Sequence, residues 1–187
     1  MKALIVYATR QGQTAKIAGR MAEYLRAHGH EAEVRNAEDP KGDMNPAPFD
    51  VVFVAAPIHA GGYPRAVARF VREHRLTLER VPSAFLSVGL AVASRTSDGR
   101  AQTMPIVERF LARTGGWQPQ RVELVAGALP YSKYNFLLRF VMRRIAKAEG
   151  GDTDTSRDYE YTDWNALERF VVTFAEGGRE DAVAAAS

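Results

Sequence analysis

Short apolar runs and amphipathic stretches alternate along the whole chain. Continuous apolar runs rich in valine, isoleucine and phenylalanine are typical of strands that are buried on both faces of a sheet. One run, Glu31–Asn36, has the length of a strand but fewer apolar positions, and it predicts a weaker strand. The pattern therefore predicts five strands, at Ala3–Ala8, Glu31–Asn36, Asp50–Ala56, Ser83–Val88 and Arg121–Ala126.

Between these runs the apolar positions recur at helical spacing. We expect the first helix to begin at Thr14 and to end near Gly29, and the second to open at Pro64. The periodic positions are Ile17, Met21, Tyr24, Leu25 and His28, then Val67, Phe70, Val71 and His74, then Met104, Val107, Phe110 and Leu111, and finally Trp164, Leu167, Phe170, Val171 and Phe174. This alternation predicts an α/β fold, a three-layer sandwich with a five-stranded parallel sheet, helices on both faces and flavodoxin-like winding.

The segment after the fifth predicted strand does not follow the alternation. It is far longer than a usual crossover, so we interpret residues 128–162 as a helical insertion into one domain that spans residues 1–177. Within it, Asn135–Lys147 has a broad apolar face and predicts a helix. The last residues, 178–187, are expected to form a frayed tail.

Composition narrows the class of protein. The 187 residues include no cysteine, which excludes disulfides, thiolate metal sites and cysteine nucleophiles, and no metal site is expected. The net charge of +3 favours an anionic partner. No apolar stretch reaches the roughly 18–20 residues of a membrane span, and the first residues do not form a signal peptide. We therefore expect a cytoplasmic protein.

The first candidate site is the loop Thr9–Thr14, TRQGQT, which joins the first strand to the first helix. Backbone N–H groups at a helix N-terminus suit an anion, threonine hydroxyls add donors, and Gly12 allows close approach. The loop lacks both the Gly-Lys-Ser/Thr ending of a triphosphate loop and the G-x-G-x-x-G of a dinucleotide site. The sequence therefore favours the monophosphate of flavin mononucleotide (FMN). The alternative is a helix whose first turn is capped by Gln13 or Thr14.

Two further loops follow strands that end at the same edge of the predicted sheet. In residues 56–66, Gly61 and Gly62 would let a planar ring lie against the backbone, with His59 and Tyr63 flanking it. The loop from Ser87 places small residues at the end of the fourth strand. The alternative for the first of these loops is an ordinary tight turn, in which His59 and Tyr63 are surface residues.

Four stretches carry a family resemblance: LIVYATRQGQT, PSAFLSVGL, VAGALPYSKYNFLLRFVMRRIAK and GGDTDTSRDYEYTDW. Together they resemble the flavodoxin-type, quinone-dependent protoporphyrinogen IX oxidases of bacteria, over nearly all of residues 1–175. The first stretch is shared by flavodoxins at large, whereas the insertion and the YTDW ending distinguish this family from plain electron carriers. The loop PIHAGGYP departs from the more basic and aromatic version of the best-known members.

The resemblance implies an enzyme that binds FMN non-covalently and oxidises protoporphyrinogen IX to protoporphyrin IX in heme synthesis. Electrons would pass to a membrane quinone, either menaquinone or ubiquinone. Position by position, the resemblance assigns the FMN phosphate to the first loop and the flavin ring to the other two. The implied cofactor-binding residues are Thr9, Arg10, Gln11, Gly12, Gln13, Thr14, Pro57, Ile58, His59, Ala60, Gly61, Ser87, Val88, Gly89 and Leu90.

The insertion is expected to face the substrate and the membrane. Arg139, Arg143 and Lys147 recur at i, i+4 spacing beside Arg144, and no acidic residue interrupts residues 131–148. A basic amphipathic helix of this kind can lie on an anionic membrane surface, which predicts a peripheral protein on the inner face of the cell membrane. Tyr131, Tyr134, Arg139, Arg143 and Arg144 are the candidates for this face. The alternative is that the apolar side packs on the sheet edge and the arginines are solvated.

Two other enzyme or carrier classes share the expected fold. One is a one-electron flavodoxin carrier, against which the basic surface counts, and the other is an NAD(P)H:quinone reductase. No nucleic-acid partner is expected because no nucleic-acid motif accompanies the charge. The sequence requires no catalytic base, and His59 is a candidate because it is the histidine of a predicted cofactor loop. Homo-oligomerisation is left open by the sequence.

Overall fold

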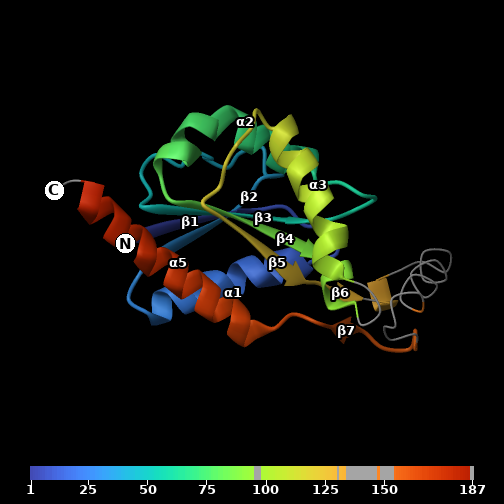
Figure 1. The fold of residues 1–187 in the computed structure, drawn as a ribbon. Helices are drawn as coiled ribbons and strands as arrows, with labels where there is room; N and C mark the ends of the chain where they lie inside the picture. The colour runs from blue at the N-terminus through green and yellow to red at the C-terminus, as the bar shows by residue number, and fades with distance from the viewer. Residues whose placement is uncertain (95–97, 130, 134–146, 148–153, 186–187) are drawn as a thin grey trace.

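A five-stranded parallel sheet forms the centre of the molecule (Figure 1). The computed structural model describes residues 1–94, 98–129, 131–133, 147 and 154–185. The strands are β1 (Lys2–Tyr7), β2 (Glu31–Asn36), β3 (Val51–Pro57), β4 (Ser83–Gly89) and β5 (Arg121–Ala126), in the order β2-β1-β3-β4-β5. All five predicted strands are therefore confirmed to within two residues, as is the flavodoxin-like winding.

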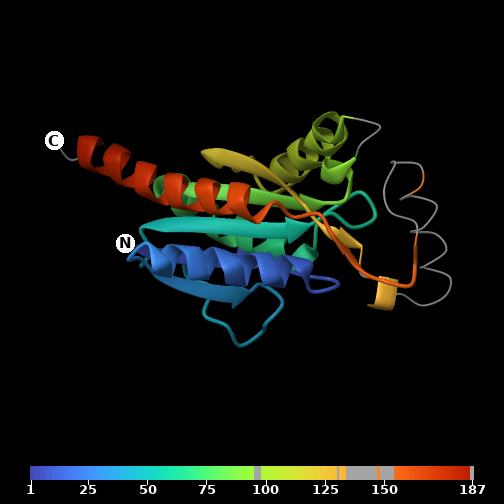
Figure 2. The same cartoon turned by 90° about the horizontal axis from the view of Figure 1, so that it is seen from below.

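Two helices cover each face of the sheet (Figures 1 and 2). Helices α1 (Gln13–Ala27) and α5 (Trp164–Ala185) lie on one face, and α2 (Arg65–Arg80) and α3 (Gly99–Arg113) lie on the other. Each layer buries its own apolar cluster against the sheet. Phe53 of β3 meets Phe170 and Phe174 of α5, whereas Phe85 of β4 stacks on Phe110 of α3. The predicted three-layer α/β sandwich is confirmed.

The central strands are buried on both faces, as continuous apolar runs predict. Every residue of β4 is buried, and so are the first six residues of β3. The edge strands β2 and β5 retain exposed or half-buried positions, which explains why β2 has the weaker apolar pattern. The buried sheet fixes where its strands end, and so it fixes the edge on which the candidate loops lie.

Beyond β5 the chain forms a small second sheet. Strand β6 (Ala128–Leu129) pairs antiparallel with β7 (Tyr159–Glu160). One 3-10 turn, Ala91–Ala93, follows β4, and another, Tyr131–Lys133, follows β6. Leu129 and Tyr131 are buried against Leu90 and the side chains of Tyr159 and Tyr161. These contacts anchor both ends of the segment that we interpret as the insertion. The predicted helix at residues 135–147 lies outside the described residues apart from Lys147.

Two predictions about this part of the chain are wrong. Tyr131 was expected on the substrate or membrane face, but its side chain is fully buried in the small cluster of Leu129 and Tyr159. The tail was expected to fray from residue 178, but α5 continues to Ala185. The helix is thus just over two turns longer than expected, and Ala182, Ala184 and Ala185 have high helix propensity.

Candidate functional site

The three candidate loops lie together at the carboxyl-end edge of the sheet. Strands β1, β3 and β4 are parallel neighbours or share a neighbour, so the segments that follow Tyr7, Pro57 and Gly89 leave the sheet on the same side. Figures 1 and 2 show the arrowheads of these strands and the small β6–β7 sheet at this edge. In open parallel sheets this is the edge at which ligands bind.

The first loop prepares a helix N-terminus for an anion. Gly12 is the N-cap of α1 and has a left-handed φ of 97°, and its N–H donates to Thr9 Oγ1 at 3.0 Å. The first backbone hydrogen bond of the helix runs from Lys16 N to Gly12 O, so the N–H groups of residues 13–15 precede the helical ladder. Because the N-cap is a glycine, it has no side chain to accept them, and the first turn holds no acidic residue.

The capped-helix alternative does not fit this geometry. Thr14 is buried, with 1% of its surface exposed, and its hydroxyl makes no hydrogen bond with any residue that the structure describes. The Gln13 side-chain amide is directed away from the loop, toward the chain beyond β5. A left-handed glycine, a hydroxyl without a protein partner and amides outside the helical ladder together fit a phosphate group.

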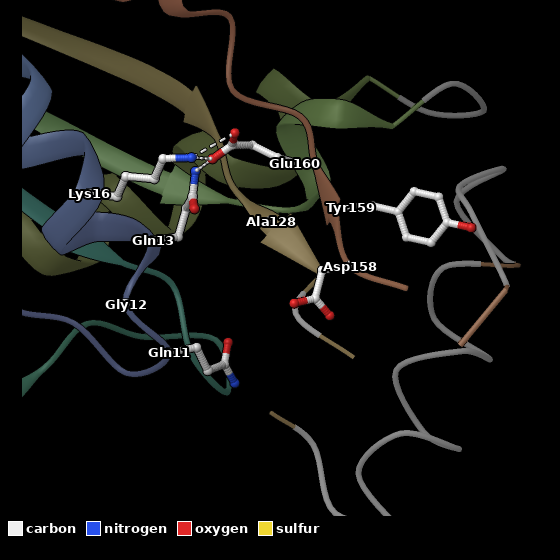
Figure 3. Close-up of a pocket in the computed structure, with 8 residues that line it drawn as sticks. All are labelled: Gln11, Gly12, Gln13, Lys16, Ala128, Asp158, Tyr159 and Glu160. Carbon is white, nitrogen blue, oxygen red and sulfur yellow. Dashed lines mark hydrogen bonds and ion pairs between the residues drawn. The ribbon is translucent and has the colours of Figure 1, made fainter. Parts of the chain in front are cut away.

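Four side chains tie the first turn of α1 to the chain around β7, and we call them the clamp: Gln13, Lys16, Glu160 and Thr162. Gln13 Nε2 donates to Glu160 Oε1 at 2.7 Å and to Thr162 Oγ1 at 3.0 Å (Figure 3). Lys16 Nζ lies 2.8 Å from Glu160 Oε1. Thr162 Oγ1 donates to the carbonyl of Ala126 at 2.7 Å, which joins the clamp to the end of β5.

The charge on Glu160 is stabilised within the clamp. Partial burial raises the pKa of the Glu160 carboxyl, but hydrogen bonds from Lys16 and Gln13 outweigh it and hold the pKa below its usual range. Glu160 is therefore ionised at neutral pH, and Lys16 compensates its charge. The clamp adds no net charge beside the first loop.

A cavity of about 390 Å³ separates the first loop from the β6–β7 sheet. Figure 3 shows Gln11 on one side of it and Asp158 on the other. Asp158 accepts hydrogen bonds from the N–H and the hydroxyl of Ser132, which fixes one wall. The lining residues are Gln11, Gly12, Gln13, Lys16, Ala128, Asp158, Tyr159 and Glu160. Asp158 on the far wall disfavours an anion there, whereas the N–H groups of the first loop suit one.

The second loop makes a tight turn that exposes its backbone. His59 N donates to Gly62 O at 2.9 Å, and Gly62 N donates to His59 O at 3.1 Å. Ala60 and Gly61 between them have φ values of 48° and 71°, the signs of a type I′ turn. A left-handed alanine costs about 1–2 kcal/mol, and the two paired backbone bonds hold it in place. His59 is exposed, and no hydrogen bond to the described residues orients its ring.

Tyr63 does not flank this turn, which corrects the prediction. Its hydroxyl is hydrogen-bonded to Ser87 Oγ at 2.7 Å, and its ring packs against Phe85 and Phe110 at centroid distances of 5.1 and 4.8 Å. Burial raises the pKa of Tyr63 to about 12 in spite of the hydrogen bond from Ser87, so the phenol stays neutral. Tyr63 packs between β4 and α3, where it contacts Phe85, Ser87 and Phe110.

At residues 87–90, the third loop presents main-chain groups rather than polar side chains to a ligand. Ser87 is fully buried and uses its hydroxyl on Tyr63, and Val88 is also buried. Val88 O accepts a 2.8 Å hydrogen bond from Ile58 N, which joins the second loop to the third. A Cβ at Gly89 would lie 3.3 Å from Ile58 Cδ1, so glycine keeps the two loops close. Leu90 packs on the small cluster around Tyr131.

Apart from the buried Tyr131, the predicted site residues fall into two groups. The structure brings residues 9–14, 57–61 and 87–90 to one edge, although Arg10 is exposed to solvent and Gln13 serves the clamp. Tyr134, Arg139, Arg143 and Arg144 lie outside the described residues. Sequence reasoning missed Lys16, Glu160 and Thr162. The sole signal for two of them was the family-specific ending that contains Glu160 and Thr162.

Comparisons with known proteins agree with this geometry. The sequence profile described as "Flavodoxin domain" matches residues 4–156. The protein of Escherichia coli K12 named protoporphyrinogen IX dehydrogenase (quinone) is 38% identical over 174 residues, which cover 91% of this chain and 93% of that protein. A protein of the same name from Leishmania major is 35% identical over 177 residues, covering 93% of this chain and 74% of that protein.

Solved structures share the fold. A flavodoxin of Streptococcus pneumoniae TIGR4 superposes with a TM-score of 0.56 at 18% identity, covering 95% of this chain and 99% of that one. Oxidised flavodoxin 1 of Bacillus cereus gives a TM-score of 0.55 at 15% identity, covering 94% and 98%. The chain therefore belongs to the flavodoxin-domain family and, within it, to the group that contains the proteins named protoporphyrinogen IX dehydrogenase (quinone).

Proposed function

We propose that this protein is an FMN-dependent oxidoreductase that converts protoporphyrinogen IX to protoporphyrin IX and passes the electrons to a quinone. The observation that carries the proposal is that the clamp joins the N-terminus of α1 to the β6–β7 sheet. The first of these can bind a phosphate, and the second holds the two ends of the insertion, which is not part of the five-stranded flavodoxin-like sheet. The relatives named for this activity are similar over nearly the whole chain.

The chain holds the FMN phosphate through main-chain groups and hydroxyls of residues 9–14. Gly12 shapes the loop, and Thr9 and Thr14 contribute hydroxyls beside the amides that precede the helical ladder. Residues 9–14 contain no carboxylate, and Lys16 compensates the charge of nearby Glu160. A dianion is therefore stabilised by oriented N–H dipoles.

The flavin ring lies against the other two loops, at Pro57–Gly61 and Ser87–Leu90. Both loops present backbone, and the His59–Gly62 turn carries little side-chain bulk at Ala60 and Gly61. Bound FMN supplies the redox chemistry, because it can accept two electrons from one partner and deliver them to another. The protein binds and orients the reactants and excludes water. In the described residues no side chain is positioned as a dedicated base, and His59 remains the candidate by location.

The membrane role of the insertion is part of this proposal. Tyr134, Arg139, Arg143 and Arg144 would face the propionates of the substrate or the phosphates of a bilayer, since guanidinium groups suit both. A cytoplasmic protein held on the inner face of the membrane would meet a lipid-dissolved quinone there. Among the described residues, no helix combines the length and the apolar character needed to cross a bilayer.

Substitutions at Gly12 test the phosphate site. Gly12→Asp places a carboxylate beside the phosphate, and Gly12→Asn is its neutral control of nearly equal shape; both residues tolerate a left-handed φ better than other side chains. We expect Gly12→Asp to bind FMN at least about 100-fold more weakly than Gly12→Asn, because like charges a few ångströms apart repel strongly. Riboflavin, which lacks the phosphate, should bind both variants equally. Equal FMN dissociation constants for the two variants, measured by fluorescence quenching, would contradict the assignment.

The clamp generates a second prediction about FMN affinity. Lys16→Met leaves the Glu160 carboxylate uncompensated near the phosphate and should weaken FMN binding by about 3–10-fold at low salt. Glu160→Gln leaves the Lys16 ammonium uncompensated and should strengthen it by a similar factor. The double variant should return to the wild-type value, and riboflavin should respond to none of these changes. If both single variants weaken FMN and riboflavin alike, the clamp is structural and does not act through charge.

An anaerobic turnover assay tests the reaction itself. FMN-loaded protein is mixed with protoporphyrinogen IX and a menaquinone analogue, and porphyrin fluorescence is followed. We expect a rate that is proportional to enzyme and that needs the quinone. A rate equal to the enzyme-free rate would overturn the proposed function while leaving the FMN site intact. Rapid bleaching of the flavin by NADPH would then indicate a quinone reductase, and a stable semiquinone on reduction would indicate an electron carrier.

A further inference from the structure

Helix α2 presents to solvent a stripe of arginines that contains one leucine. Positions 65, 69, 72, 76 and 80 follow the i, i+4, i+7, i+11 and i+15 spacing of one helix face. The opposite face is buried against the sheet through Val67, Phe70, Val71 and Leu78. All five outward residues are exposed, and we call them the arginine stripe: Arg65, Arg69, Arg72, Leu76 and Arg80.

Helix α2 as a whole carries a net charge equal to that of the complete chain. Helix α2 contains five arginines and two glutamates, a net charge of +3, and the complete chain also carries +3. The remaining residues therefore sum to zero. The positive charge of α2 is therefore a local property of its surface.

The arginines of the stripe have no acidic partners in the part of the chain that the structure describes. The ion pair on this helix joins Arg75 to Glu79 at 2.7 Å, outside the stripe. On the other face of the sheet, by contrast, Lys16 pairs with Glu160 and Arg20 pairs with Glu23. Two cations of α1 are thus paired with carboxylates, whereas α2 leaves four guanidinium groups available to an external anion.

An apolar side chain lies within the stripe. Leu76 is 60% exposed, more than any other large hydrophobic residue that the structure describes. Leu76 lies between Arg72 and Arg80 on the helix surface, with Glu73 and Glu79 at i−3 and i+3, and an exposed side chain there has no packing role in the core. It suits the boundary between lipid headgroups and acyl chains, where basic residues meet phosphates and apolar residues enter the bilayer.

The stripe also has a defined position relative to the site. Arg65 follows directly on the segment that carries the His59–Gly62 turn, at the carboxyl-end edge of the sheet. From there the stripe runs about 22 Å along α2 toward the opposite edge. A flat anionic surface in contact with the whole stripe would therefore have the candidate FMN loops at one end of the contact.

We propose that the arginine stripe of α2 is a docking surface for an anionic phospholipid bilayer. Guanidinium groups bind lipid phosphates, and Leu76 enters the interface between headgroups and acyl chains. The choice of a bilayer over another anionic partner rests on the proposed function, because its quinone is dissolved in lipid. The surface is separate from residues 139–144 of the insertion, and it would hold the folded sheet, rather than the insertion alone, against the membrane.

Vesicle co-sedimentation tests the stripe directly. The FMN-loaded full chain is mixed with vesicles of phosphatidylglycerol and phosphatidylcholine, or of phosphatidylcholine alone. We expect binding to the anionic vesicles only, weakening as salt rises. Arg69→Gln/Arg72→Gln should lower the partition coefficient by about 30-fold. The matched control, Arg20→Gln/Arg169→Gln, removes the same charge from α1 and α5 on the other face and should change binding by less than about threefold.

A second variant separates lipid contact from simple charge attraction. Leu76→Gln keeps every charge and should reduce binding to anionic vesicles by about threefold or more. Equal binding by the α2 and control charge variants would overturn the proposal. Loss of binding in Arg139→Gln/Arg143→Gln alone, with the α2 variants unaffected, would assign docking to the insertion and would also overturn it.

The test is independent of the proposed reaction. Sedimentation reads lipid binding without substrate, and the α2 variants should retain their FMN and their turnover with a water-soluble quinone analogue. A protein that binds vesicles through α2 but does not oxidise protoporphyrinogen IX would keep the docking surface and lose the proposed function. Turnover without vesicle binding would do the reverse.

Discussion

The candidate ligand site depends on the backbone N–H donors at the start of α1. The N–H groups of residues 13–15 precede the first helical hydrogen bond, and the N-cap, Gly12, brings no side chain to them. Buried or half-buried donors of this kind need an acceptor. A phosphate can be that acceptor, and the N–H groups can bind it without the help of a cationic side chain. The strand order places this helix start beside the loops after β3 and β4, so one ligand can meet all three.

The clamp extends this site to the part of the chain that distinguishes the family. Gln13 and Lys16 of the first turn bind Glu160, and Thr162 binds the carbonyl at the end of β5. The β6–β7 sheet and the cluster around Tyr131 hold the same region from the other side. In the proposed function, FMN binding and substrate selection therefore lie on adjoining surfaces that meet at the first loop.

Local patterns predicted the fold well because the forces that build it are local or periodic. The buried runs of β1, β3 and β4 locate the centre of the sheet, and glycine-containing loops after them locate the ligand edge. Contacts between side chains that are far apart in the sequence produce no comparable pattern in it. Gln13 and Glu160 are 147 positions apart, and nothing in TRQGQT indicates that Gln13 turns away from the loop. Tyr63 resembled a loop aromatic, but its ring fills the space between Phe85 and Phe110. Propensity at the last alanines extended α5 where a tail was expected.

Binding of the phosphate by the first loop is tested most directly by following individual amides while FMN is added to the apoprotein. In a two-dimensional ¹⁵N–¹H titration, we expect the amide signals of Gly12, Gln13 and Thr14 to shift strongly with FMN and much less with riboflavin. Those of Ala60, Gly61 and Gly89 should shift with both ligands. Saturable FMN binding that leaves the amides of residues 12–14 unmoved would place the phosphate elsewhere and contradict the account.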